Sequence, residues 1–381
     1  MNSQERREAR YQRRKAKREK RRTDLTAQYG FELVANPDSL YKAMKKARRG
    51  VYWKASVQRY NMNYLRNILR ASKDLRAGRD VRKGFIEFDI IERGKLRHIQ
   101  SVHFSERVVQ RSLCANALKP LLTRSFIYDN SASLENKGIH FAINRLKAHL
   151  SRHYKEHGAE GYVLLVDFKS YYPNIRHQPI YDIYTKAFGE DERLVNLSMD
   201  FVYAFGEQGL GLGGETCQIA AISYSNANDH YAKEVLRCRF YGRYMDDSYF
   251  ICESKEQAQR ILDAMRARYE MFGITAHPRK TAIVKLTRGF SFLKTHFSLD
   301  PATGHVILRP SRESAVRQRR KLKKFKRFLD AGEMELNDVR SAYMSWRGFI
   351  KHTEAGRTMR CMDDLYKRLF GMSPLTKLPK S

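Results

Sequence analysis

Paired cysteines are absent from this sequence. Its five cysteines are an odd number, and no two of them form a Cys-X-X-Cys pair. This pattern favours neither a disulfide framework nor a cysteine zinc site, so we interpret the thiols as reduced and mostly structural. They are Cys114, Cys217, Cys238, Cys252 and Cys361.

Long apolar runs are also absent. The longest, such as residues 162–166, are far too short to cross a bilayer, and the N-terminal residues lack the apolar core of a signal peptide. These two absences predict a cytoplasmic protein that has no membrane partner.

Acidic residues are scarce relative to basic ones. The chain has 41 Asp and Glu against 73 Lys and Arg, which gives a formal net charge of +32. A polyanion offsets such repulsion best, so nucleic acid is the favoured partner; a basic phage or ribosomal protein and a membrane-surface binder are the alternatives. With 42% hydrophobic residues in 381, the chain can bury the core of two or three subdomains. Composition alone leaves catalysis open.

Short apolar segments predict the strands. Residues 85–92 and 96–102 flank a Gly-Lys turn and predict a strand pair. Residues 161–168 predict a buried strand that delivers Asp167 to the rim of a sheet. A hairpin that turns at a Met-Asp pair is predicted within residues 238–253.

Helices are predicted outside these strands. Residues 1–22 alternate Arg, Lys and Glu, which indicates a mobile arm or solvated helix that touches phosphates, or equally a solubilising tail. The segment after Ser254 has a capping-box pattern with Gln257 and an apolar stripe at helical spacing. From Ser311 onward, basic residues surround apolar ones at helical spacing, which predicts a helical module along a nucleic-acid backbone.

The sharpest local signal is the pair Asp246–Asp247 at the hairpin tip. Adjacent carboxylates repel each other at neutral pH, and a divalent cation beside them removes that repulsion. A solvated turn is the alternative, and for a bare Asp-Asp pair it would be preferred. Aromatic residues on both sides of the pair, between Phe240 and Phe250, favour a buried hairpin and therefore a metal site.

Asp167 supplies a second acidic element. It ends a buried strand and precedes a turn with paired aromatics, a position that a helix N-cap would also occupy. Two metal ions about 3.5–4 Å apart need carboxylates from separate strands, and that arrangement serves in-line phosphoryl transfer. Asp167 and the Asp246–Asp247 pair together predict a two-metal site.

The order of these elements resembles that of reverse transcriptases. An Asp-X-X-X-X-aromatic segment, a Gly-rich segment that contains Gln218, and Tyr-X-Asp-Asp follow one another along the chain. The Gly-rich segment, residues 209–218, is similar to a stretch in bacterial retroelement enzymes, with Gly211 at the usual proline and Cys217 at the usual serine.

Further blocks extend the resemblance over roughly residues 85 to 300 and into the C-terminal helices. Glu106 stands where the family's fingers segment has an aspartate. The similar blocks are 94–97 and 106–110 of the fingers, 277–281 of motif D, 289–293 of the primer grip and 346–348 of the thumb.

The resemblance implies an α+β fold, namely a right-hand polymerase with fingers, an antiparallel-sheet palm and a short helical thumb. The implied boundaries are residues 1–23 for a basic N-terminal arm, 24–159 for the fingers, 160–300 for the catalytic palm and 311–381 for the helical thumb.

It also implies that Asp167, Asp246 and Asp247 are catalytic. Asp167 and Asp246 would ligate two Mg²⁺ ions, with Mn²⁺ as the alternative ion, while Asp247 tunes the site or touches the metal indirectly. The backbone carbonyl of Phe168 would add a metal ligand. Tyr172 is expected to exclude a 2′-hydroxyl and so to select deoxynucleotides, with an ordinary core tyrosine as the alternative.

Other residues are expected to contact substrates. Lys95 and Arg97 suit the triphosphate because Arg grips phosphate oxygens in a bidentate fork, although Lys95 would also fit as a surface cation. Lys280 matches a lysine that donates a proton to departing pyrophosphate, or else it merely contacts the nucleic-acid backbone. Gln218 is expected near the template or the incoming base, or as a helix cap. The expected nucleic-acid contacts of the thumb are Lys321, Lys324, Arg327, Trp346 and Arg347.

These implications predict an RNA-directed DNA polymerase that uses an RNA template and dNTPs. An RNA-templated RNA polymerase shares the palm, but the Tyr-Met-Asp-Asp tip and Tyr172 favour DNA synthesis. A non-catalytic RNA-binding protein would explain the charge and leave the acidic pair unexplained. Several blocks resemble the enzymes of diversity-generating retroelements and related prophage or antiphage-defence systems, which implies a dedicated non-coding RNA, a DNA product and, in some systems, an accessory protein.

Overall fold

The computed structural model describes residues 2–92, 95–189 and 191–376. The chain forms two compact units and passes between them several times. The first unit consists of residues 1–134, 168–237 and 264–277, and the second of residues 135–167, 238–263 and 278–381.

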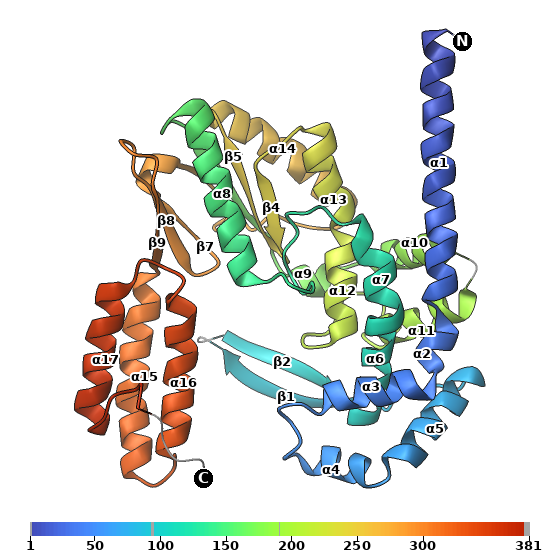
Figure 1. The fold of residues 1–381 in the computed structure, drawn as a ribbon, viewed down its shortest axis with the longest axis horizontal. Coiled ribbons are helices and arrows are strands. Elements are labelled where there is room, and N and C mark those ends of the chain that lie inside the picture. Colours follow the sequence, from blue (N-terminus) through green and yellow to red (C-terminus); the bar gives the residue numbers. More distant parts are fainter. Residues whose placement is uncertain (1, 93–94, 190, 377–381) are drawn as a thin grey trace. The chain divides into compact units, whose positions relative to one another are not determined.

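The first unit is mainly helical (Figure 1). Most side chains of α6 and α12 are buried, so these two helices form the centre of its core. Its helices are α1 (Ser3–Gln28), α2 (Phe31–Ala35), α3 (Pro37–Ala47), α4 (Ala55–Met62), α5 (Tyr64–Arg76), α6 (Phe104–Leu113), α7 (Lys119–Leu122), α9 (Tyr171–Asn174), α10 (His177–Phe188), α11 (Glu192–Tyr203), α12 (Glu215–Tyr224) and α13 (Asn226–His230).

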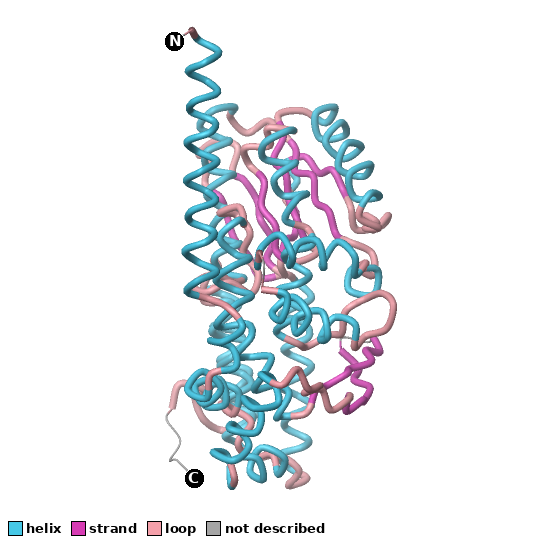
Figure 2. The backbone as a smooth tube through the Cα atoms, turned by 90° about the vertical axis from the view of Figure 1, so that its right-hand side faces the viewer, coloured by secondary structure: helices cyan, strands magenta, loops and turns pink. Residues whose placement is uncertain are grey.

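The basic N-terminal segment is a helix. Figure 2 shows α1 as one continuous coil with the N-terminus at its far end, and nearly all of its described side chains are exposed. Asn2 and Glu5 form a capping box that satisfies the first backbone N–H groups. Of the forms that the sequence left open, the structure has the solvated helix.

The predicted strand pair of the first unit is confirmed. Strands β1 (Phe85–Glu92) and β2 (Lys95–Val102) are antiparallel, with Phe85 opposite Val102 and Ile90 opposite Arg97. Gly94 of the predicted turn lies outside the described residues, as does the side chain of Lys95.

A four-stranded antiparallel sheet organises the second unit. Its strand order is β4-β5-β3-β6, formed by Tyr241–Tyr244, Asp247–Cys252, Tyr162–Asp167 and Ala282–Lys285. The side chains of strand β3 do not alternate clearly between buried and exposed, because both faces of the strand are covered. This order confirms the predicted hairpin and the predicted buried strand that ends at Asp167.

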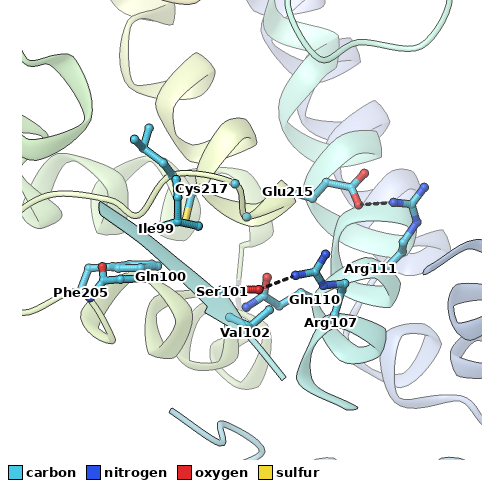
Figure 3. A pocket seen from close by; sticks show the side chains of 13 residues that line it. Ile99, Gln100, Ser101, Val102, Arg107, Gln110, Arg111, Phe205, Glu215 and Cys217 are labelled. Carbon is cyan, nitrogen blue, oxygen red and sulfur yellow. Dashed lines mark hydrogen bonds and ion pairs between the residues drawn. The ribbon is translucent and has the colours of Figure 1, made fainter. Parts of the chain in front are cut away.

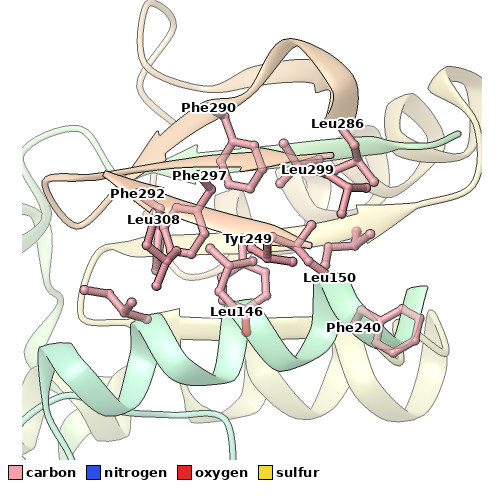
Figure 4. Close-up of a cluster of buried hydrophobic side chains, with 14 of the residues drawn as sticks. Leu146, Leu150, Phe240, Tyr249, Leu286, Phe290, Phe292, Phe297, Leu299 and Leu308 are labelled. Carbon is pink, nitrogen blue, oxygen red and sulfur yellow. The ribbon is translucent and has the colours of Figure 1, made fainter. Parts of the chain in front are cut away.

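Helix α8 (Ile139–His157) and a second sheet enclose the core of this unit. The second sheet has the order β7-β8-β9, formed by Phe290–Phe292, Thr295–Leu299 and Val306–Pro310. Figure 4 shows Leu146 and Leu150 of α8 converging with Tyr249 and with Phe297 on the two sheets. The expected boundaries assign α8 to the fingers, whereas it packs here with the strands that carry the acidic residues.

Helix α14 (Lys255–Met271) begins as the sequence predicts. The Gln257 N–H donates to the Ser254 hydroxyl at 3.1 Å, and the Glu253 N–H donates to the Gln257 side chain at 2.8 Å. Gly273, with φ +66°, follows its last turn.

Three helices close the chain within the second unit. They are α15 (Arg312–Asp330), α16 (Leu336–Ile350) and α17 (Gly356–Phe370), and they share a core that includes Leu322, Tyr343 and Tyr366. They form the helical module that the sequence predicts from Ser311 onward. The buried residues of α17, Met362 and Tyr366, stand among charged neighbours. Helices with antiparallel sheets confirm the predicted α+β class. In the described part of the chain, no helix is long and apolar enough to span a membrane.

Candidate active site

Strand register brings the three predicted carboxylates to one end of the four-stranded sheet of the second unit. Asp167, the last residue of β3, pairs with Asp247, the first residue of β5. Asp247 also pairs with Tyr244 of β4, so Met245 and Asp246 form the turn between β4 and β5. Met245 adopts a left-handed backbone with φ +55°, which makes this turn tight.

Burial makes the carboxylates of Asp246 and Asp247 costly to ionise. The pKa of Asp247 is raised to about 7, first by burial and then by the charges of Asp246 and Asp167. The pKa of Asp246 is also raised, chiefly by burial. Asp246 and Asp247 therefore lie close to Asp167, and a positive charge beside them would stabilise the ionised form of all three carboxylates.

Lys280 supplies one positive charge at this site. Its Nζ donates to both carboxylate oxygens of Asp167 at 2.8 Å. Asp167, Asp247 and Lys280 line a cavity of about 170 Å³, together with residues of β7 such as Phe292. The predicted pyrophosphate lysine thus contacts a predicted catalytic acid directly.

The donor set fits a divalent cation. In the described residues, no group of three or more His, Cys, Asp or Glu side chains is already arranged to hold a metal ion. The Asp167, Asp246 and Asp247 carboxylates nevertheless offer the oxygen ligands that Mg²⁺ prefers, and the ammonium of Lys280 occupies a cation's place against Asp167. Mg²⁺ binding by these carboxylates stays a prediction, and it would require Lys280 and Asp167 to separate.

Phe168, the other predicted ligand, is anchored by its side chain. Its ring is buried and lies against Tyr171 and Tyr269, with ring centroids 5.1 and 4.8 Å away. Its backbone forms a bridge with Ala276. The metal contact of its carbonyl stays a prediction.

Arg243 is a site residue that the sequence interpretation missed. Its side chain is almost fully buried in β4, and its Nη1 donates to the Met245 carbonyl at 2.9 Å, which supports the left-handed turn. Its charge also lowers the pKa of Asp246 and opposes the effect of burial. The sequence does offer a signal for this residue. Arg243 is a lone cation in an otherwise apolar strand, three residues before the acidic pair.

We expect the substitution Lys280→Ala to tighten Mn²⁺ binding. Removing the ammonium beside Asp167 removes about 1–2 kcal/mol of cation repulsion, which is roughly a 5–30-fold gain in affinity. Electron paramagnetic resonance of Mn²⁺, titrated without nucleotide, measures it. Lys285→Ala, which removes a partly exposed lysine paired with Glu160, is the matched control. Unchanged or weaker binding in Lys280→Ala would contradict this account.

The first unit contains a second cavity, which is lined partly by the Gly-rich segment. A cavity of about 290 Å³ lies between β2, α6 and this segment, as Figure 3 shows. Arg107 donates to the Ser101 hydroxyl at 3.1 Å, and Arg111 pairs with Glu215 at 3.2 Å. Gln100 and Phe205 also line this cavity.

Gly211, which replaces the usual proline, is required by packing. A Cβ at this position would lie 2.1 Å from the Phe205 ring. Phe205 is held in turn by stacking on Phe85 of β1, with ring centroids 4.9 Å apart. Cys217 is buried beside the same segment, and burial raises the pKa of its thiol to about 12, so it is a structural residue.

We expect Gly211→Ala to lower the free energy of unfolding by about 1–3 kcal/mol, because Phe205 must move to admit the methyl group. Gly348→Ala is the matched control, since its Cβ would meet nothing within 4 Å. In a helix that control is expected to be neutral or stabilising. Urea denaturation of both variants measures the difference, and equal midpoints would contradict the packing argument.

Gln218 lies inside α12, which excludes the predicted alternative of a helix cap. The helix starts after Gly214, and the Gln218 side-chain oxygen accepts a hydrogen bond from the Ser133 hydroxyl at 2.9 Å. Its contact with template or base stays a prediction.

Tyr172 is only half-buried, and its neighbour Tyr171 is the core tyrosine. The Tyr171 hydroxyl donates to the Ala221 carbonyl at 2.6 Å. The Tyr172 carbonyl accepts from the Leu210 N–H at 2.9 Å, which ties this tyrosine to the Gly-rich segment. The alternative of an ordinary core residue therefore describes Tyr171 better than Tyr172.

The predicted contacts of the thumb divide into two groups. Lys321 and Lys324 are exposed on α15, each over a phenylalanine ring at about 5 Å, and Arg327 is exposed on the same helix. Trp346 instead donates to Ser314 at 3.1 Å, and Arg347 forms a fork with Asp363. The last two residues form hydrogen bonds within the C-terminal three-helix core, and their contact with nucleic acid stays a prediction.

Comparison with known proteins gives the family. The family model described as reverse transcriptase (RNA-dependent DNA polymerase) matches residues 82–297. Among solved structures, the chain is similar to apo telomerase from Candida tropicalis truncated from its C-terminal domain, with 13% identity and a TM-score of 0.45. That similarity covers 58% of this chain and 54% of the telomerase chain, so it spans about half of each. Comparison with curated proteins gives no match.

The family match contains the acidic residues and the Gly-rich segment described above. Its limits, residues 82 and 297, enclose β1, the Gly-rich segment, the three carboxylates and Lys280. The match also covers more than half of the 381 residues. The chain therefore belongs to the family of reverse transcriptases, the RNA-dependent DNA polymerases.

Proposed function

We propose that this protein makes cDNA on an RNA template by two-metal nucleotidyl transfer. The register of β3 and β5 carries the proposal, because it pairs Asp167 with Asp247 and leaves Asp246 at the adjacent turn. Membership of the reverse transcriptase family supports the same chemistry.

The residues of the chain have distinct tasks in this proposal. Asp167 and Asp246 hold Mg²⁺, and Asp247 tunes the site. Bound Mg²⁺ lowers the pKa of the attacking hydroxyl and stabilises charge on the leaving oxygen. Lys280 leaves Asp167 and donates a proton to the departing pyrophosphate.

The fingers and the Gly-rich segment hold the nucleotide in this proposal. Arg97 on β2 and the neighbouring Lys95 bind the triphosphate, and Gln218 lies near the base. Tyr172 excludes a 2′-hydroxyl. The fixed hydrogen bond between the Tyr172 carbonyl and Leu210 supports this role, because it keeps the tyrosine backbone in one place.

We further propose that the template is a dedicated non-coding RNA of a diversity-generating or antiphage-defence system in the cytoplasm. The net charge of +32 supports a partner RNA that stays bound, and Lys321, Lys324 and Arg327 offer exposed contacts along α15. An accessory protein would act with this complex in some of these systems.

Primer extension tests the proposed activity. The purified protein receives a DNA primer on an RNA template, with Mg²⁺ and either dNTPs or NTPs. We expect extension with dNTPs that stops when Mg²⁺ is chelated. Extension with NTPs alone would indicate an RNA polymerase, and tight RNA binding without any extension would indicate a non-catalytic binding protein.

A further inference from the structure

An uninterrupted basic stretch lies in the first unit, outside every site described above. Residues 39–73 contain ten Lys and Arg and no Asp or Glu. They form most of α3, the loop between α3 and α4, all of α4 and most of α5. The basic residues are Lys42, Lys45, Lys46, Arg48, Arg49, Lys54, Arg59, Arg66, Arg70 and Lys73.

Three aromatic rings are exposed within this stretch. Trp53 is 73% exposed, Tyr52 is 51% exposed and Tyr41 is 38% exposed. Leaving large apolar rings in water is unfavourable, and such groups gathered on one surface indicate a binding function. Tyr41 also packs on the Tyr64 ring, with centroids 5.7 Å apart, and the Tyr52 hydroxyl accepts from Asn61 at 3.4 Å, so Trp53 is the most exposed of the three rings.

Each of these rings has a cation over it. Lys45 Nζ lies 5.2 Å from the Tyr41 centroid, Arg48 lies 5.7 Å from that of Tyr52, and Lys54 lies 5.4 Å from that of Trp53. We call these six residues the aromatic-basic surface. Alternating rings and cations match a strand of bases and phosphates, since bases stack on rings and phosphates bind cations.

Internal hydrogen bonds fix the loop that carries Tyr52 and Trp53. The Val51 N–H donates to the Arg48 carbonyl at 3.1 Å, and the Lys54 N–H donates to the Val51 carbonyl at 3.0 Å. The Arg48 side chain also donates to Asn61 at 2.6 Å. The rings are therefore presented by an ordered turn, so binding would lose little conformational entropy.

The opposite face of α3 is used for packing. Leu40, Met44 and Ala47 are buried, and α3 packs against α6. The helix therefore cannot turn its basic side inward, and Lys45 stays exposed. The fold holds the aromatic-basic surface open to solvent.

We propose that the aromatic-basic surface binds single-stranded RNA, with bases stacked on Trp53 and Tyr52 and phosphates on Lys45, Arg48 and Lys54. Double-stranded RNA would not serve, because its bases are already stacked. The choice of RNA over DNA rests on the proposed function, which requires an RNA template. The surface goes beyond that function because it lies before residue 82, where the family match begins.

A membrane is the competing partner for exposed Trp and Tyr beside Lys and Arg. Membrane-surface helices place their apolar residues on one helical face and their cations on the other. Here Tyr52 and Trp53 stand in a turn, and each has a cation over its ring. The arrangement favours a polymer in which flat apolar groups and charges alternate.

Tryptophan fluorescence tests the contact directly. The chain has two tryptophans, Trp53 and Trp346, so the full-length Trp346→Phe variant reports on Trp53 alone. The probe is a 20-nucleotide oligouridine, added without template or nucleotides. We expect saturable quenching of the Trp53 emission, at the same concentration that saturates the anisotropy of the labelled probe. Unchanged emission at saturating RNA would overturn the proposal.

Substitutions separate stacking from charge. Tyr52→Ala with Trp53→Ala is expected to weaken binding roughly tenfold or more without changing its dependence on salt. Gln at Lys45, Arg48 and Lys54 is expected to reduce the slope of log affinity against log salt by roughly 2. Tyr128→Ala, which removes a tyrosine that is 64% exposed elsewhere in the unit, should change neither. Circular dichroism checks that each variant is folded.

Three further outcomes of these binding experiments would also overturn the proposal. Equal loss in Tyr128→Ala would show a non-specific effect, tighter binding of oligodeoxythymidine would indicate DNA, and a shift of Trp53 emission with phosphatidylserine vesicles but not with RNA would indicate a membrane. The binding assay contains no dNTPs, so its result is independent of polymerase activity. Quenching without DNA synthesis would contradict only the proposed function, and synthesis without quenching would contradict only this surface.

Discussion

Replacing Asp167 by asparagine is expected to abolish nucleotide incorporation while the chain stays folded and retains RNA. Asparagine keeps the shape of the side chain but removes the charge that pairs with Lys280 at 2.8 Å and that would hold a metal ion. Metal stabilisation of the transition state contributes several kcal/mol, so we expect a loss of roughly a thousandfold or more. Single-nucleotide incorporation on a primed RNA template measures it.

Asp364→Asn is the control for that substitution. Asp364 is exposed on α17 of the same unit, so its replacement changes the net charge equally without touching the site. Filter binding of the template is measured in parallel for both variants. If Asp167→Asn incorporates nucleotides as well as the control does, Asp167 is not catalytic.

Replacing Tyr172 by valine is expected to relax the choice of sugar. The Tyr172 backbone stays anchored through Leu210, so the substitution mainly removes the half-buried ring. Loss of a steric contact of this size is expected to reduce the discrimination between deoxyribonucleotides and ribonucleotides by roughly 10–200-fold. The ratio of kcat/KM for dTTP to that for UTP on an RNA template measures the change.

Tyr171→Phe separates this role from a structural one. It removes a buried hydroxyl that donates to Ala221, so we expect lower stability and an unchanged sugar preference. If Tyr172→Val lowers stability in the same way and leaves the sugar preference unchanged, Tyr172 is a core residue.

Much of the palm was predictable because its signals are local. Strands β3, β4 and β5 are short apolar segments, and the turn of Met245 and Asp246 separates β4 from β5 between aromatic flanks, which favour a buried hairpin. The cap of α14 depends on Ser254 and Gln257, which are three residues apart. Patterns that span only a few neighbouring residues can be recognised in a single sequence.

The rest of the site depends on contacts between distant segments. The pairing of Asp167 with Asp247 requires the strand order β4-β5-β3-β6, and the contact of Lys280 with Asp167 joins residues 113 positions apart. The role of Gly211 depends on where Phe205 lies. Periodicity and spacing carry no information on such distances.

The surroundings of single side chains are likewise absent from sequence patterns. Trp346 and Arg347 resembled nucleic-acid contacts, yet Ser314 and Asp363 engage them within the thumb. The sequence around Trp53 carries no motif, because one tryptophan among basic residues forms no recognisable pattern. The exposure of its side chain depends on how α3 and the following loop fold.

The most direct test of the account begins with RNA that copurifies with the protein. That RNA is sequenced and then used as the template for Mg²⁺-dependent dNTP incorporation, by the native chain and by a variant with both Asp246→Asn and Asp247→Asn. The account predicts DNA synthesis by the native chain, none by the variant, and equal RNA retention by both. Equal RNA retention with no synthesis by either protein would contradict it and would leave an RNA-binding protein with a polymerase fold.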